Sequence, residues 1–159
     1  MAYTEKNIRR SAETFLQIRT IGGAECTNDI YARSPGKFEY WYIGKVARTD
    51  GTVKDINQAI SRLWNMMEEH ACRLRAVELG REFGNVELWV ARGDSELEMS
   101  QALGSGSGSG DKMSLKKMER YAVGSEHVKA LEVGFIAEVV NNDGKGFLIV
   151  RDDEGRVMQ

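Results

Sequence analysis

The sequence predicts an α+β fold, a largely antiparallel sheet with two main helices packed on one face. The segments 85–92 and 130–140 alternate apolar with polar residues, which is typical of half-buried strands, and the segment 37–48 is rich in aromatic and β-branched residues, which also favours a strand. Two other segments carry apolar residues three and four positions apart, which is the spacing of amphipathic helices. Strands and helices interspersed in this way favour a sheet that is backed by helices.

Length and composition fit a single domain. The chain has 159 residues, of which 42% are hydrophobic and 29% are charged, and a chain of this size buries roughly two thirds of its unfolded surface. Its net charge of −2, without runs of like charge, makes nucleic acid an unexpected partner. No apolar stretch approaches the roughly 20 residues of a membrane-spanning helix. The lack of a signal-peptide core and the two cysteines predict a cytoplasmic protein in a reducing compartment.

Residues 104–110 read GSGSGSG. Such a repeat has almost no side-chain surface to bury, behaves as a flexible coil and is typical of engineered linkers. Three origins fit it: a replaced loop, a fusion of two chains, or a circular permutation whose linker joins the natural ends. Because MSLKKMERY, which begins at Met113, resembles a natural start, permutation is the favoured interpretation and fusion the next. The natural order would then be 113–159 followed by 2–103.

Read in that order, the chain begins with a short helix and a three-stranded meander. Apolar residues on one side of 114–122 indicate the helix. The alternating segment 130–140, the turn residues NNDGKG at 141–146 and the segment FLIVR predict a hairpin. The acidic turn at 152–155 would then return the chain as a third strand over 156–159.

The remaining segments supply two helices and two strands. Thr4 is a candidate N-cap for the first helix. The segment 22–37 is polar and contains glycines, which predicts a long connection of the kind that lines binding sites. An aromatic-rich strand over 37–48 follows, and Asp55 then begins a helix of about twenty residues. The segment NVELWVAR, residues 85–92, predicts the last strand.

Candidate catalytic and metal-binding residues do not form a recognisable constellation. His70 and Cys72 lie two positions apart on the long helix and point in different directions, so one metal ion cannot be held by both. We interpret His70 as a hydrogen-bonded structural histidine, Cys72 as a thiol on the exposed face and His127 as a loop residue. The acidic residues at 94–98 and 152–154 are interpreted as solvated. The sequence therefore predicts no catalytic residue, no metal and no cofactor.

Aromatic side chains are concentrated on one predicted strand. Phe38, Tyr40 and Tyr42 alternate with Trp41, and Trp89 lies on a second strand. If helices cover only one face of the sheet, the aromatic residues of the other face are exposed and can bind a partner. The predicted binding residues are Phe38, Tyr40, Trp41, Tyr42 and Trp89.

Two stretches, ECTNDIYARSPGKFEYWYIGKVAR and EEHACRLRAVELG, resemble small cyanobacterial and chloroplast proteins of poorly assigned role. The resemblance implies an accessory or assembly factor of the photosynthetic apparatus, located in the cytoplasm or the chloroplast stroma. It defines no catalytic residue.

Two classes of function stay open. The first is a non-catalytic binding or assembly module that binds a protein partner through the aromatic strand face and the loop 22–37. The alternative is a small enzyme, or a fold that binds a small apolar ligand, with a pocket between sheet and helix. A closed cavity containing His70 with Tyr40 or Tyr42 would favour this alternative, and a homo-oligomer is compatible with either class.

Overall fold

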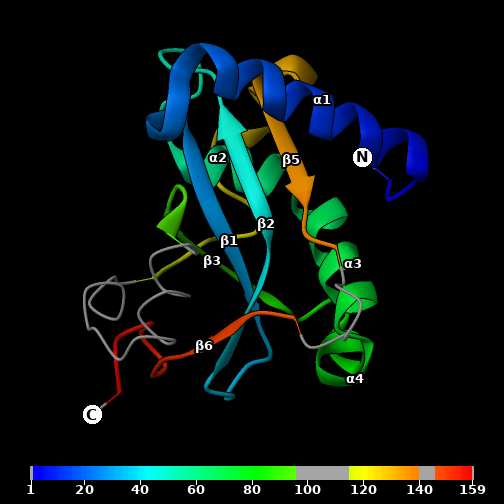
Figure 1. The fold of residues 1–159 in the computed structure, drawn as a ribbon, viewed down its shortest axis with the longest axis vertical. Coiled ribbons are helices and arrows are strands. Elements are labelled where there is room, and N and C mark those ends of the chain that lie inside the picture. The colour runs from blue at the N-terminus through cyan, green and yellow to red at the C-terminus, as the bar shows by residue number, and fades with distance from the viewer. Residues whose placement is uncertain (1, 96–114, 140–145, 159) are drawn as a thin grey trace.

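The computed structural model describes residues 2–95, 115–139 and 146–158, and it has an α+β fold (Figure 1). The helices are α1 (Glu5–Gly22), α2 (Ile56–Arg62), α3 (Trp64–Leu74) and α4 (Ala76–Leu79). The strands are β1 (Thr27–Arg33), β2 (Glu39–Arg48), β3 (Glu87–Arg92), β4 (Lys116–Lys117), β5 (Val133–Ala137) and β6 (Leu148–Val150).

The strands form one antiparallel sheet of six strands in the order β4-β3-β1-β2-β5, with β6 also paired to β2. The predicted fold class and the predicted strands over 37–48 and 85–92 are confirmed. The Gly–Ser repeat at 104–110, the acidic residues Glu96 and Glu98, and most of the predicted turn at 141–146 lie outside the described residues.

Strand β1 occupies the middle of the sheet, where the sequence predicts a long connection. It lies between β2 and β3 and is buried on both faces, so its residues do not alternate in polarity. Its polar residues are paired. Buried Asp29 accepts a hydrogen bond from Lys45 Nζ at 3.0 Å, and Arg33 donates to Glu87 at 3.0 Å. These buried charges give a core strand the composition of a loop.

Helix α1 begins as predicted and covers the face of the sheet opposite α2 and α3. The Thr4 side chain accepts a hydrogen bond from the backbone N–H of Asn7 at 3.1 Å, which caps the helix. Phe15 packs with Ala47, whose neighbour Val46 belongs to the core beneath α2 and α3. Adjacent strand residues point to opposite faces, so helices cover both faces of the sheet. The α+β class is confirmed, but the predicted packing of the two main helices on one face is wrong. In Figure 1, α1 crosses in front of the sheet and α2 lies behind it.

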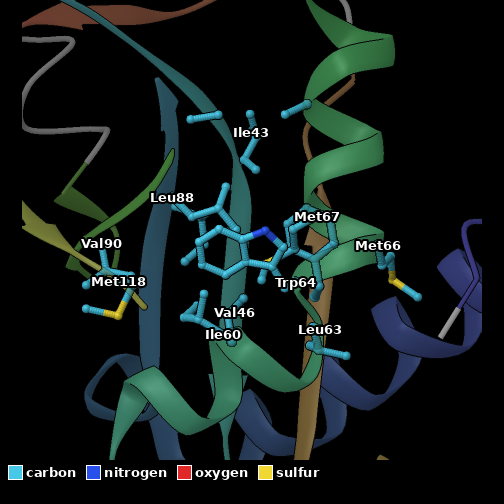
Figure 2. Packing of buried hydrophobic residues seen from close by; sticks show 14 of the residues in the cluster. Ile43, Val46, Ile60, Leu63, Trp64, Met66, Met67, Leu88, Val90 and Met118 are labelled. Carbon is cyan, nitrogen blue, oxygen red and sulfur yellow. The ribbon is translucent and has the colours of Figure 1, made fainter. Parts of the chain in front are cut away.

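The predicted long helix consists of two helices, α2 and α3, that meet at Leu63. The Asp55 side chain accepts a hydrogen bond from the backbone N–H of Asn57 at 2.9 Å and caps α2. Leu63 has φ −107° and ψ 10°, outside the helical range, and the chain changes direction there. The main core lies against these helices, and Figure 2 shows Trp64 in its middle, between Leu88 and Met67.

Residues 115–158 extend both edges of the sheet. The sequence predicts a helix over 114–122, whereas the structure has β4 and turns there. Leu115 and Met118 are three residues apart, a spacing that fits one side of a helix but also the two opposite faces of a strand. They enter different hydrophobic clusters on the two faces.

The predicted hairpin of 130–140 with FLIVR is also wrong. Strands β5 and β6 both pair with β2, one after the other along its edge, and not with each other. The acidic turn at 152–155 is confirmed, because Asp152 accepts hydrogen bonds from the backbone N–H groups of Gly155 and Glu154. In place of the predicted third strand, the described residues have one isolated bridge, between Arg151 and Val157.

The described chain begins beside α1 on one side of the molecule and ends on the opposite side in Figure 1. The circular permutation, in which residue 159 would run into residue 2, stays a prediction.

Candidate functional site

Most of the predicted aromatic binding residues are buried. Tyr40, Tyr42 and Trp89 belong to a hydrophobic cluster that also contains Leu115 and Ile149 from the C-terminal part of the chain. This cluster fills the face of the sheet that the sequence suggests is exposed. The expectation of an exposed aromatic ladder is therefore wrong, and Phe38, at 46% exposure, is the one residue of the five that the solvent reaches broadly.

The hydroxyl of Tyr40 shows why this face is closed. It donates a hydrogen bond to the backbone oxygen of Asp152, and the guanidinium of Arg33 lies 5.1 Å from the centre of its ring. Burial raises the pKa of Tyr40 to about 12. Arg33 also forms an ion pair with Asp153, so the predicted solvated turn is attached to the sheet on that side.

Trp41 lies on the other face and lines an open groove. The groove has a volume of about 330 Å³. Its lining residues come from the turn after β1, the start of β2 and helix α4, and they are Ser34, Lys37, Glu39, Trp41, Val77, Glu78 and Leu79. Trp41 is 8% exposed and forms part of the wall, whereas Val77 is 91% exposed. We call this the Trp41 groove.

Local contacts hold the walls of the Trp41 groove. The guanidinium of Arg75 lies 4.0 Å from the centre of a Trp41 ring, a stacked cation–π contact, and Arg75 also forms an ion pair with Glu78. Leu79 is fully buried and anchors α4, which directs Val77 to the solvent. On the opposite side, the backbone N–H of Lys37 donates to the oxygen of Ser34 at 3.1 Å and closes the turn.

This groove combines an apolar wall with charged residues of both signs. Val77 and the edge of Trp41 provide the apolar surface, and Lys37 and Glu78 lie beside it. Tryptophan walls surrounded by polar groups are a common feature of sites that receive one side chain of a protein partner. Part of the predicted loop 22–37 lines the groove, through Ser34 and Lys37. No signal in the sequence pointed to Val77, because its exposure depends on how α4 packs.

His70 is held on both sides and lies away from the tyrosines of the predicted pocket. Its Nδ1 is 2.9 Å from the hydroxyl of Tyr3, and its Nε2 is 2.7 Å from the backbone oxygen of Glu138. Its ring packs edge-on against Phe135, which belongs to the core beneath α2 and α3. Tyr40 and Tyr42 lie on the opposite face of the sheet. Burial lowers the pKa of His70, which favours the neutral form.

The remaining candidate residues are buried structural residues, surface ion pairs or exposed residues. Cys72 is buried, contrary to the predicted exposed thiol, because its Sγ lies 3.4 Å from the backbone oxygen of Leu79 beneath α4. Burial raises the pKa of this thiol to about 11. His127 is an exposed loop residue, as predicted. Asp94 was predicted to be solvated, but it accepts a hydrogen bond from Arg19, which lowers its pKa to about 2.

The described part of the chain holds neither a cluster of metal ligands nor a candidate membrane-spanning helix. No group of three or more histidine, cysteine, aspartate or glutamate residues in this part of the chain is arranged to hold a metal ion. None of the helices in the described ranges has the length and apolar character that crossing a membrane requires. The chain matches no family model, no curated protein and no solved structure.

Proposed function

We propose that this protein is a non-catalytic binding module that receives an apolar side chain of a protein partner in the Trp41 groove. The observation that supports the proposal is the exposed Val77 beside the wall formed by Trp41, in a groove that residues of the predicted binding loop and strand also line. Trp41 is stacked by Arg75 in the free protein, so the wall is formed before a partner arrives. A preformed wall lowers the entropy cost of binding.

The charges beside the groove select the partner. Lys37 and Glu78 line the groove together with Glu39. Glu78 is already paired with Arg75, so a basic residue next to the apolar anchor of a partner is expected to pair with Glu39. An aromatic or leucine side chain is the expected anchor, because buried aromatic and large aliphatic contacts dominate binding energies. The cyanobacterial and chloroplast resemblance stays a prediction, and an assembly factor is one class of protein that binds in this way.

A displayed library of random peptides provides a defined probe. Peptides selected on the unmodified protein are measured against Val77→Asp, which places a charge inside the groove, and against Val123→Asp as the matched control. Val123 is 93% exposed and lies in the loop that contacts α2, outside the groove. We expect Val77→Asp to weaken the selected peptides by about tenfold or more, and Val123→Asp to change their affinity by less than about twofold. A selection without binders, or equal effects of both variants, contradicts the proposal.

A further inference from the structure

The chain consists of two unequal parts on either side of the Gly–Ser repeat. Residues 2–95 contain the four α-helices and the three neighbouring strands β3, β1 and β2. Residues 115–158 contain β4, β5 and β6, which are short, and two single turns of 3-10 helix. We call these two parts the helical unit and the wrapping segment.

The wrapping segment pairs with the helical unit at both edges of its three strands. Strand β4 pairs with β3 on one side, while β5 and β6 pair with β2 on the other. Between them, the described strands of the wrapping segment form no ladder, and Arg151–Val157 is a single bridge. The wrapping segment thus takes its strand structure from the helical unit, as an added strand does when it completes the open edge of another chain's sheet.

The contact between the two parts is a core interface. The wrapping segment contributes buried apolar side chains to both faces of the sheet, and they are Leu115, Met118, Val128, Val133, Phe135 and Ile149. An interface that resembles a domain core cut in two is typical of obligate complexes of separate chains.

Polar contacts fix the register of the wrapping segment along its length. Ser11 Oγ accepts a hydrogen bond from the backbone N–H of Phe135 at 2.8 Å, and Arg62 Nε donates to the oxygen of Val128 at 3.0 Å. Near the C-terminal end, buried Arg33 forms an ion pair with Asp153. Gly134 lies so close to α1 that a Cβ there would be 2.3 Å from the backbone nitrogen of Phe15. The two backbone bonds fix the position of the wrapping segment, and the contacts of Gly134 and Asp153 depend on its sequence.

We infer that the wrapping segment is a separable partner polypeptide of the helical unit, and that the Gly–Ser repeat ties the two chains of a complex together. The inference agrees with the fusion origin of the repeat, and it does not depend on the Trp41 groove, since all seven residues that line that groove belong to the helical unit. On this basis the covalent linker raises the effective concentration of the two parts for each other, but it does not determine how they pack.

The test uses the full chain with a protease recognition site inserted among residues 104–110. The folded chain is cleaved in native buffer, and we expect the two fragments to co-elute as one complex. The urea midpoint of the cleaved protein should rise by about 0.5 to 1.4 M for each tenfold increase in protein concentration, because its unfolding now separates two molecules. The uncleaved chain is the control, and its midpoint should not change with concentration.

A matched pair of variants tests the interface itself. Val133 is buried and Val123 is 93% exposed, and both belong to the wrapping segment. In the cleaved protein, Val133→Ala should weaken the association of the fragments by about tenfold or more, and Val123→Ala by less than about twofold. The fragments are also separated in urea, mixed and returned to native buffer, where we expect the complex to form again. Fragments that part or precipitate on cleavage, or that fail to reassociate, would overturn the inference, and so would equal effects of the two variants.

Discussion

The carboxylate of Glu68 is buried in α3, and it accepts hydrogen bonds from the backbone N–H groups of Gly84 at 2.8 Å and Val86 at 3.1 Å. These bonds hold the turn that leads into β3. Buried Asp29 has a comparable role, because it accepts from the hydroxyl of Ser95 at 2.7 Å and from the backbone N–H of Asp94 at 3.2 Å. Hydrogen bonds of this kind offset the cost of burying a carboxylate. A sequence pattern, however, predicts that an acidic residue is exposed.

His70 gives a pH-dependent prediction at the scale of one residue. The folded protein favours neutral His70, since burial lowers its pKa. The stabilisation is therefore complete above the unfolded pKa of about 6.5 and is lost as the pH falls through the lower folded value. We expect the free energy of unfolding to fall below about pH 6.5 in the unmodified protein. In His70→Gln, which keeps a donor and an acceptor, this fall should be absent.

The measurement is urea unfolding across that pH range, monitored by circular dichroism. The comparison uses the slope of the unfolding free energy against pH and not its absolute value, because the substitution also changes packing against Phe135 and Tyr3. Parallel pH profiles would show that His70 is not the titrating group.

At the scale of elements, the sequence predicted α1 from its helical period and cap, and β2 and β3 from their content of aromatic and branched apolar residues, although both strands are buried on both faces. Such patterns failed for β1, which is buried on both faces and contains paired charges. They also failed for β4, whose two residues are too few to show a period. The candidate site was predicted only in part: Trp41 and Lys37 line the groove, but the burial of Tyr40, Tyr42 and Trp89 depends on residues more than fifty positions away in the sequence.

The crossing of α1 over β5 depends on the missing side chain of Gly134. A Cβ at this position would lie 2.3 Å from the backbone nitrogen of Phe15 and 2.7 Å from the oxygen of Ser11. Neither backbone atom can move without shifting the helix, so Gly134→Ala should destabilise the fold by about 1 to 3 kcal/mol. Gly80→Ala is the matched control, because its nearest neighbour would be 3.9 Å away and its φ is −58°. Urea unfolding of both variants measures the difference, and a Gly134→Ala protein as stable as Gly80→Ala would show that α1 does not pack here so closely.

At the scale of the whole molecule, both faces of the sheet are covered, one by α2 and α3 and the other by α1 and the C-terminal residues (Figure 1). The aromatic residues are thereby used for two cores, and the proposed partner surface is at the margin of the sheet. There, the start of β2 meets α4, and Trp41 and Val77 line the same groove. A sequence shows which side chains are large and apolar, but which of them remain exposed depends on segments that are distant in the chain.

Binding in the Trp41 groove is the central claim, and mapping a selected peptide on the protein by NMR tests it most directly. The protein is labelled with ¹⁵N, and the peptide with the highest affinity from the displayed library is added in steps. We expect the largest chemical-shift changes at the backbone amides of Lys37 and Val77 and at the indole N–H of Trp41, and little change at the amide of Val123. Shifts concentrated elsewhere, with the signals of Val77 and Trp41 unmoved at saturation, would contradict the account.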